Sequence, residues 1–223
     1  MLDKQGGKCY NYYVMKTYLF DFDGTLVDSM PTFVAVMLRI LDENKITYDD
    51  SIVKTITPLG YKGTAEHFAK LGVKISPDEQ VRIMNEYARV EYAENIMAKH
   101  SVKETLEKLR KSGNGLNILT ASPHSMLDVC LKRLGLYSLF DNVWSCDDFG
   151  MTKADPEIYR AAAKRLGVET ADVIFLDDNI GALKTAKSSG MKVYGVYDPS
   201  SDDYKEEIKN ISDRYITEFS ELL

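Results

Sequence analysis

The chain has few cysteines, and their spacing forms neither a metal site nor a disulfide framework. Cys9, Cys130 and Cys146 are odd in number and far apart, with no CxxC pair and no zinc-ligand spacing. This pattern argues against a zinc module and predicts reduced thiols in a cytoplasmic protein. Cys130 is expected to be a core residue on a helix.

Long apolar runs and an excess of basic residues are also missing. No run approaches the ~18 residues that a membrane-spanning helix needs. The net charge of −6 disfavours nucleic acid and anionic membrane surfaces as partners. An anionic substrate would therefore have to be attracted locally, by a metal ion or a few placed lysines. A monomer is the default expectation.

The chain is long enough for one medium domain, or for a core domain that carries a small inserted one. It has 223 residues, and its 44% hydrophobic and 28% charged residues are ordinary for a globular protein. The opening stretch MLDKQGGKCYNYYV lacks the three regions of a signal peptide. Residues 1–15 are expected to be an N-terminal extension, and translation from Met15 is the alternative.

Strand-like segments alternate with helical patterns over much of the chain. Buried strands are predicted at Thr17–Asp21, Leu116–Thr120, Val173–Asp177 and Lys192–Val196, with a shorter candidate at Asp141–Ser145. Helical patterns separate these strands from about residue 101 onward. The alternation predicts an α/β fold, with a parallel sheet covered by helices on both faces.

Local signals place several helix ends. Ser101 and Glu104 have the spacing of a capping box, and Ser122-Pro123 and Asp155-Pro156 each predict a helix start. Gly167 marks one helix end. The charged stretch Asp202–Leu223 is expected to form a peripheral helix.

Residues 30–98 interrupt the alternation. Helical patterns follow one another there without clear strands, at Met30–Asn44 and in a long helix capped by Ser76–Glu79. This block predicts an inserted helical domain at 30–98, with the core domain formed by 16–29 and 99–223.

Chemically useful side chains follow the predicted strands. Asp21 and Asp23 follow the first strand, Thr120 ends the second, and Asp177 and Asp178 end a third. Ligands of such sheets bind beyond the carboxyl ends of the strands. With Lys153, the set suits phosphoryl transfer, which needs a nucleophile, a proton donor and positive charge. Carboxylates from two strands are suitable ligands for Mg²⁺.

Four segments carry a family resemblance: DFDGTLVDS, ILTAS, TKADPEIY and FLDDN, in that order. They resemble the four motifs of the haloacid dehalogenase superfamily, and the resemblance extends from about Lys16 to Val196. The insertion after the first motif resembles the helical C1-type cap of the phosphoglycolate-phosphatase and β-phosphoglucomutase branch. The resemblance implies a Rossmann-like parallel-sheet core with an inserted helical C1 cap.

The resemblance also implies roles for individual residues. Asp21 corresponds to the nucleophile that forms an aspartyl-phosphate, and Asp23 to the general acid and base. Asp21, Asp23 (through its backbone carbonyl) and Asp177 correspond to the Mg²⁺ ligands. Asp178 corresponds to a nearby supporting carboxylate.

Further correspondences concern the phosphate. Thr120 and Ala121 would bind the transferring phosphoryl group, and Lys153 would hold the nucleophile and the phosphate. Gly24 and Thr25 would shape the turn that carries Asp23. The third motif departs from the common K-P-D-P at Ala154, where a slightly altered turn is expected.

Asp23 narrows the expected function. By resemblance, dehalogenases lack an aspartate two residues after the nucleophile, so the aspartate favours phosphate esters. The expected function is a Mg²⁺-dependent phosphatase of a small phosphorylated metabolite. The alternatives are a phosphomutase of the β-phosphoglucomutase type and a catalytically silent binding protein.

The segment Pro58–Phe68 has two interpretations. By resemblance, it is a cap loop that closes over the substrate, where Tyr61 and Lys62 contact an anion or hydroxyl of the leaving group. Alternatively, it is a loop that initiates a helix, with Thr64 as the cap.

Overall fold

The computed structural model describes residues 15–223, which contain one parallel six-stranded sheet in the order β3-β2-β1-β4-β5-β6. The predicted extension before Met15, with Cys9, lies outside the described residues. The strands are β1 (Thr17–Phe20), β2 (Gly115–Thr120), β3 (Asn142–Ser145), β4 (Val173–Asp177), β5 (Lys192–Val196) and β6 (Arg214–Ile216). The α/β fold class and its parallel sheet are therefore confirmed.

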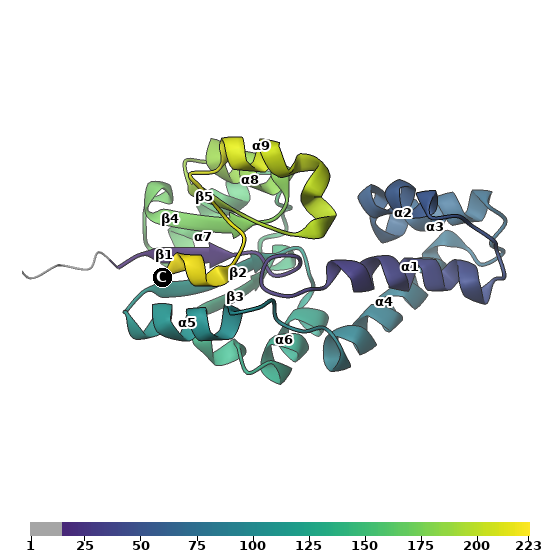
Figure 1. Ribbon diagram of the computed structural model, residues 1–223, viewed down its shortest axis with the longest axis horizontal. Helices are drawn as coiled ribbons and strands as arrows, with labels where there is room; N and C mark the ends of the chain where they lie inside the picture. Colours follow the sequence, from purple (N-terminus) through teal and green to yellow (C-terminus); the bar gives the residue numbers. More distant parts are fainter. Residues whose placement is uncertain (1–14) are drawn as a thin grey trace, which may run out of the picture.

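Helices cover both faces of the sheet, as the alternation predicted (Figure 1). The helices of this core are α5 (Val102–Lys111), α6 (His124–Arg133), α7 (Pro156–Leu166), α8 (Ile180–Ser188) and α9 (Lys205–Ile211). Short 3-10 helices lie at Tyr137–Leu139, Cys146–Phe149, Thr170–Asp172, Pro199–Tyr204 and Phe219–Leu222. Among residues 15–223, every helix is too short or too polar to cross a lipid bilayer.

The central strand β1 contributes side chains to both hydrophobic layers, one on each face of the sheet. Its side chains alternate between the faces of the sheet, so Tyr18 and Phe20 belong to one buried cluster and Leu19 to another. The first cluster includes side chains of α5 and α6, and the second includes side chains of α7, α8 and α9. A strand buried on both faces is apolar throughout, which made β1 easy to recognise in the sequence.

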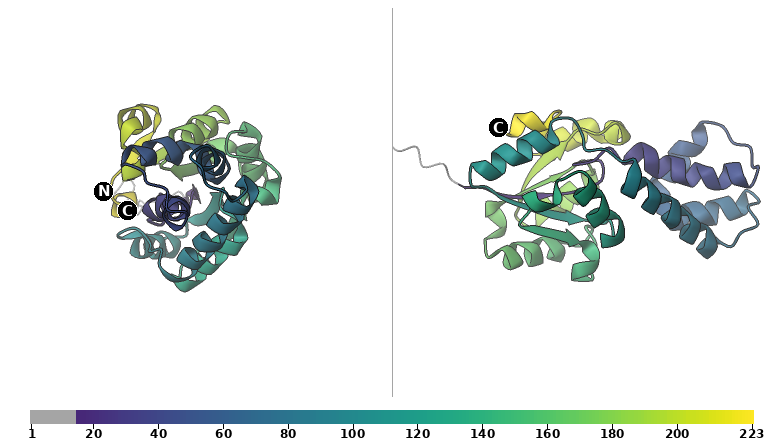
Figure 2. Two further views of the ribbon diagram at one scale, coloured as in Figure 1. Left: turned by 90° about the vertical axis from the view of Figure 1, so that its right-hand side faces the viewer. Right: turned by 90° about the horizontal axis from the view of Figure 1, so that it is seen from below.

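The insertion between β1 and α5 is helical. It contains α1 (Met30–Glu43), α2 (Ser51–Ile56), a 3-10 turn (Thr57–Leu59), α3 (Gly60–Lys70) and α4 (Pro77–Glu94). These helices share a hydrophobic cluster of their own, which includes Met37, Phe68 and Met84. They lie beyond the carboxyl ends of the strands, at one end of the molecule (Figures 1 and 2).

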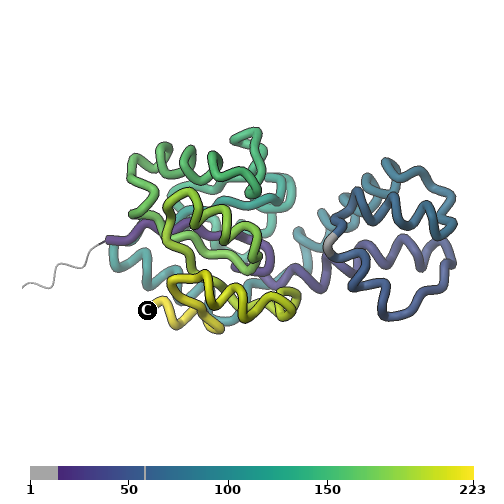
Figure 3. The backbone as a smooth tube through the Cα atoms, turned by 90° about the horizontal axis from the view of Figure 1, so that it is seen from above, coloured from purple at the N-terminus to yellow at the C-terminus, as the bar shows by residue number. Residues whose placement is uncertain are grey.

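Two connecting segments join the insertion to the core (Figure 3). They pair with each other. Val27 and Ala98 form an antiparallel bridge. The backbone N–H of Asp28 donates to Met97 (2.9 Å), and that of Lys99 donates to Leu26 (3.0 Å). The pairing holds the two connecting segments together at one point of the core.

Two helix starts differ from the sequence-based predictions. The capping box at Ser101 is wrong: its φ is 59°, it makes no side-chain cap, and its hydroxyl accepts the N–H of Ser220 (3.2 Å). Helix α6 begins at His124, and Ser122 turns instead toward Asp23. Asp155 does cap α7, where its carboxylate accepts the N–H of Glu157 (2.9 Å).

Two other segments also differ. The stretch expected to form a peripheral helix contains the short α9 followed by β6, which adds to the sheet edge beside β5. Most of Pro58–Phe68 lies in helix α3. Thr64 is not a cap, because it is buried inside α3 and its hydroxyl donates to the Ile56 carbonyl (3.2 Å).

Candidate functional site

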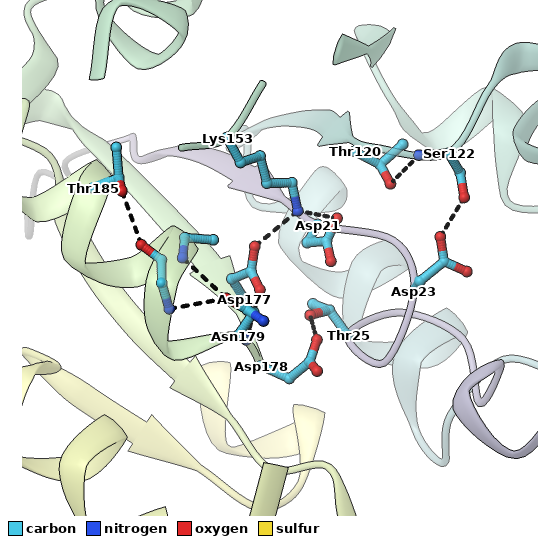
Figure 4. A network of polar contacts seen from close by, with 12 residues as sticks. Asp21, Asp23, Thr25, Thr120, Ser122, Lys153, Asp177, Asp178, Asn179 and Thr185 are labelled. Carbon is cyan, nitrogen blue, oxygen red and sulfur yellow. Dashed lines mark hydrogen bonds and ion pairs between the residues drawn. The ribbon is translucent and has the colours of Figure 1, made fainter. Parts of the chain in front are cut away.

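The ends of three neighbouring strands bring the predicted side chains together (Figure 4). β1 pairs in parallel with both β2 and β4, and the N–H of Asp21 continues the ladder to the Leu176 carbonyl (2.8 Å). Asp21 therefore lies beside Asp177 of β4, with Thr120 at the end of β2. Parallel pairing makes this convergence a consequence of strand order.

Three buried carboxylates form the centre of the site. Asp21, Asp177 and Asp178 are 6%, 0% and 5% exposed. One oxygen from each lies within 4.8 Å of the other two. Burial removes water that would otherwise separate such charges. The group therefore needs positive charge nearby if all three carboxylates are to remain ionised.

Lys153 supplies one positive charge. Its ammonium forms ion pairs with Asp21 and with Asp177, the latter at 2.8 Å. Burial of the ammonium lowers its pKa, but Asp177 and Asp21 more than offset this, and the pKa of Lys153 lies well above its usual value. Lys153 is therefore charged at neutral pH and bridges two of the three carboxylates.

Asp177 and Asp178 remain crowded despite the charge of Lys153. Burial raises the pKa of Asp177 to about 7, although Lys153 acts in the opposite direction. Burial, followed by the charges of Asp177 and Asp21, raises the pKa of Asp178 well above its usual value. Both directions follow from burial and neighbouring negative charge, which a further cation would offset.

Gly24 permits the close approach of two segments. It has a φ of 69°, and a Cβ atom there would lie 2.7 Å from Oδ2 of Asp178. Its neighbour Thr25 is fully buried, and its hydroxyl donates to Oδ1 of Asp178 (3.0 Å). The turn after β1 therefore contacts Asp178 in two ways. Gly24 allows the close approach of the backbone, and Thr25 donates a hydrogen bond.

The donor set fits a hard divalent cation. Such ions prefer carboxylate oxygens, and the buried Oδ1 of Asp21 receives no well-directed hydrogen bond, although Lys153 lies against it. Asp21, Asp177 and Asp178 are the carboxylates that converge. Asp178 therefore belongs to the converging set, although the resemblance gave it only a supporting role.

Asp23 lies apart from this group. Its carboxylate accepts hydrogen bonds from Ser29 (2.7 Å), Ser122 (2.5 Å) and Tyr92. Burial and the Asp21 charge raise the pKa of Asp23, while the three hydroxyls act to lower it. The side chain therefore lies outside the carboxylate cluster, among three hydroxyls. Its role in proton transfer and the use of its backbone carbonyl for the metal remain predictions.

The other predicted residues are placed as follows. Thr120 is 1% exposed, and its hydroxyl accepts the N–H of Ser122 (3.1 Å). Ala121 is exposed in the turn before α6. Lys62 is exposed on α3. The structure therefore groups Thr120 with the strand ends, whereas Lys62 is not joined to the carboxylate cluster.

Sequence reasoning missed the hydroxyls around Asp23. Tyr92 has the spacing of a core residue on α4, and it is indeed buried, but its hydroxyl reaches the core domain's aspartate. Ser122 was considered as a helix cap. Ser29 is the last residue of the first motif and directly precedes helix α1, and this position was the available signal.

Comparisons with known proteins agree with this geometry. The family model described as "Hydrolase: haloacid dehalogenase-like hydrolase" matches residues 15–190. The pyrophosphatase PpaX of Bacillus velezensis is 31% identical, over 80% of this chain and 81% of its own. Validoxylamine A 7'-phosphate phosphatase of Streptomyces hygroscopicus is 29% identical, over 81% and 85%.

A solved structure gives the same result for the fold. The chain from Thermotoga maritima described as "putative beta-phosphoglucomutase" has a TM-score of 0.81 and 25% identity, and the match covers 94% of this chain and 97% of that one. The family model covers most of the described residues and all four motifs. By its sequence, fold and strand-end carboxylates, the chain belongs to the haloacid dehalogenase-like hydrolases.

Proposed function

We propose that the protein is a Mg²⁺-dependent phosphatase that hydrolyses a small phosphorylated metabolite through an aspartyl-phosphate on Asp21. The observation that carries this proposal is the position of Asp21. Its carboxylate is buried at the end of β1, against Lys153 and beside Asp177 and Asp178. An anionic nucleophile can approach an anionic phosphate only where positive charge is concentrated.

The first transfer begins at the Asp21 carboxylate. One oxygen attacks phosphorus, and the bond between phosphorus and the ester oxygen breaks as the leaving group departs. Asp23 gives its proton to that ester oxygen, which leaves as a neutral hydroxyl. Burial and the neighbouring Asp21 charge, which raise the pKa of Asp23, favour the protonated form that this step needs.

The second transfer releases the phosphate. Asp23, now ionised, takes a proton from water, and the water oxygen attacks phosphorus. The bond from phosphorus to Asp21 breaks, and the carboxylate is restored. Asp23 thus serves as the acid in one step and as the base in the next. It ends the cycle protonated, as it began, so the protein neither gains nor loses a proton.

Other residues hold the phosphoryl group. Lys153 orients Asp21, and Thr120 with the N–H of Ala121 would donate to phosphoryl oxygens. The carboxylates of Asp21, Asp177 and Asp178, with the Asp23 backbone carbonyl, would hold Mg²⁺. When bound, Mg²⁺ supplies positive charge to the phosphoryl oxygens.

The domain assignment belongs to this proposal. Residues 16–29 and 99–223 would form the catalytic core, and 30–98 a C1-type cap. Helices α1–α4 lie beyond the strand ends that carry Asp21 and Asp177 (Figure 1). Closure of such a cap would keep bulk water from the first transfer and admit one water for the second.

The names of the relatives support phosphate chemistry and differ in substrate. They include a pyrophosphatase, a validoxylamine A 7'-phosphate phosphatase and a phosphorylated carbohydrates phosphatase. A panel of phosphomonoesters with Mg²⁺ tests the proposal by phosphate release. Asp21→Asn is expected to lower kcat by about 1,000-fold or more.

The matched control for that variant is Asp172→Asn, at an exposed aspartate in the turn before β4. It is expected to keep the wild-type rate. Equal rates for Asp21→Asn and wild type would contradict the assignment of the nucleophile.

A phosphomutase is the second candidate, and the likeness to the Thermotoga structure favours it. In a mutase, a sugar hydroxyl would accept the phosphoryl group from Asp21 in place of water. Conversion of glucose 1-phosphate to glucose 6-phosphate faster than release of free phosphate would establish this alternative.

A further inference from the structure

We propose that the site selects phosphomonoesters whose leaving group is a neutral polyol, and disfavours esters whose leaving group carries negative charge. This inference rests on the proposed function, because it concerns the side of the site where the leaving group would lie. In an in-line displacement, the leaving oxygen is opposite the Asp21 oxygen. That oxygen must also be within reach of the Asp23 proton, so the surroundings of Asp23 set the leaving-group chemistry.

Hydroxyl groups surround the Asp23 carboxylate. Ser29 comes from the turn before α1, Ser122 from the turn after β2, and Tyr92 from α4. Three separate segments therefore present hydroxyls to one carboxylate. Hydroxyls both donate and accept hydrogen bonds, so this ring can exchange its internal hydrogen bonds for bonds with the hydroxyls of a polyol.

Aromatic faces lie next to these hydroxyls. Phe33 of α1 stacks on Tyr61 of α3, with ring centroids 4.8 Å apart, and Phe22 stacks on Tyr92 at 6.2 Å. Tyr61 is half-buried and packs against both the core cluster and the cluster of the helical insertion. Pockets for neutral ligands combine such apolar rings with a few placed polar groups.

Tyr61 belongs to the surroundings of Asp23. Burial raises the pKa of the Tyr61 phenol, and the negative charge of Asp23 raises it further. Tyr92 is buried and donates its hydroxyl to the Asp23 carboxylate. Tyr61 packs against the cluster that includes Tyr92, so Tyr61, Tyr92 and Asp23 lie in one region.

Basic side chains near the strand ends are engaged elsewhere. Lys153 pairs with Asp21 and Asp177. Lys99 pairs with Asp198 (2.8 Å), and the Arg133 guanidinium donates to backbone carbonyls at the end of α4. Within residues 15–223, no lysine or arginine forms an ion pair with Asp23.

An anionic leaving group would therefore meet an unfavourable environment. It would lie among phenols and aromatic faces, without a paired cation, and beside Asp23, which becomes negatively charged as it gives its proton to the leaving oxygen. An unpaired charge in a partly buried site, next to a second charge of the same sign, is unfavourable. A neutral polyol does not incur this cost and gains hydrogen bonds from the hydroxyl ring. The side chains around Asp23 therefore favour a neutral leaving group over an anionic one.

Lys62 is the competing explanation. It follows Tyr61 directly on α3 and is exposed. If its ammonium turned into the site, it would favour an anionic leaving group, the opposite preference. Lys62→Met separates the two interpretations, because it removes the charge and keeps most of the side-chain length.

The experiment compares substrates of similar size. Glycerol 1-phosphate has a neutral leaving group, and 2-phosphoglycolate has a carboxylate on its leaving group; phosphate release with Mg²⁺ gives kcat/KM for each. We expect glycerol 1-phosphate to be preferred by at least about tenfold. Equal values, or a preference for 2-phosphoglycolate, would overturn the inference and leave the proposed phosphatase standing.

Variants test whether the side chains around Asp23 cause this preference. Tyr61→Lys places a cation in the lining and should reduce the preference for glycerol 1-phosphate by about tenfold. Tyr48→Phe, an exposed tyrosine of the same helical insertion, should not change it. A selective loss of 2-phosphoglycolate hydrolysis in Lys62→Met would assign the leaving-group contact to Lys62 and overturn the inference.

The failure of the proposed function would look different. If no substrate, p-nitrophenyl phosphate included, releases phosphate in the presence of Mg²⁺, then both the phosphatase and the inference about its leaving group are overturned.

Discussion

The phenolic hydroxyl of Tyr92 donates a hydrogen bond to the Asp23 carboxylate, across 69 positions of the sequence. Asp23 lies in the turn after β1, and Tyr92 near the end of α4 in the helical insertion. The contact joins the two parts of the molecule at the residue proposed to transfer protons. Any movement of α4 relative to the core must break or reform it.

Removing this hydroxyl should change the protonation of Asp23. Tyr92→Phe removes a donor that lowers the Asp23 pKa, so that pKa should rise. The limb of the pH–rate profile set by Asp23 should move to higher pH, because protonated Asp23 is the acid of the first transfer. On the plateau below that limb, loss of the hydrogen bond that positions Asp23 should lower kcat/KM by about tenfold. Tyr87→Phe is the matched control on the same helix, because its hydroxyl donates to the exposed Glu43. Identical profiles for both variants would contradict this role.

Loss of Lys153 should affect both activity and stability. Lys153→Met leaves Asp21 and Asp177 buried without their cation. Removing one partner of a buried ion pair destabilises proteins by about 3–5 kcal/mol, and the rate should fall by about 100-fold or more. Lys164→Met, at an exposed residue of α7, is the control. Urea unfolding and phosphate release measure the two effects; a wild-type rate in Lys153→Met would refute the role of this lysine.

Mg²⁺ should stabilise the folded protein through the three carboxylates. Binding to the folded state alone raises the free energy of unfolding by about 2.7 kcal/mol at a concentration 100 times Kd. The gain in Tm with Mg²⁺ should largely disappear in Asp177→Asn and remain in Asp172→Asn. Thermal unfolding with and without EDTA measures this independently of activity. A Tm gain in Asp177→Asn as large as in wild type would place the metal elsewhere.

Gly24→Ala tests the close approach of the first turn to Asp178. The new Cβ atom would lie 2.7 Å from Oδ2 of Asp178, at a φ of 69°. Gly150→Ala is the matched control, because its φ is 61° and a Cβ there would meet nothing within 4 Å. Both should lose about 1 kcal/mol from backbone strain. Only Gly24→Ala should also weaken the Mg²⁺-dependent gain in Tm; equal behaviour would show that Asp178 is not held by this turn.

His124 should contribute a pH-dependent stability. Its ring contacts Asp128 and Asp148, each at 2.9 Å, and hydrogen bonds to these carboxylates raise its pKa above 6.5 despite partial burial. Because the folded-state pKa is the higher one, the stabilisation is fully present below 6.5 and is lost as pH rises through the folded-state value. His124→Gln should therefore cost less than about 1 kcal/mol, with the largest cost at low pH. Urea unfolding from pH 5 to 9 measures it, with His67→Gln as control; a cost that grows with pH would contradict the assignment.

The sequence predicted the sheet well because its central strands are buried on both faces. Two of these strands, Thr17–Phe20 and Val173–Asp177, are apolar runs followed or ended by an aspartate. The sequence therefore indicated both the strands and the polar side chains at their ends. The carboxylates of Asp21 and Asp177 follow from strand order alone. By contrast, β6 has three residues at a sheet edge, which is too short for a periodic pattern.

Side-chain contacts between distant segments were not predictable. Tyr92 has the spacing of a core residue on a helix, and nothing local indicates that its hydroxyl reaches Asp23. Ser101 and Glu104 matched a capping box, but the serine adopts a left-handed conformation and contacts the C-terminal segment. In both cases, tertiary packing determined the contact of the side chain, and the neighbouring sequence did not indicate it.

The stereochemical course at phosphorus tests the central claim most directly. A thiophosphate monoester made chiral at phosphorus with two oxygen isotopes is hydrolysed in water that carries the third isotope, and the configuration of the released thiophosphate is determined. Transfer to Asp21 and then to an acceptor comprises two in-line displacements, so we expect retention of configuration. Inversion would show that the acceptor attacks the substrate directly and would contradict an aspartyl-phosphate on Asp21.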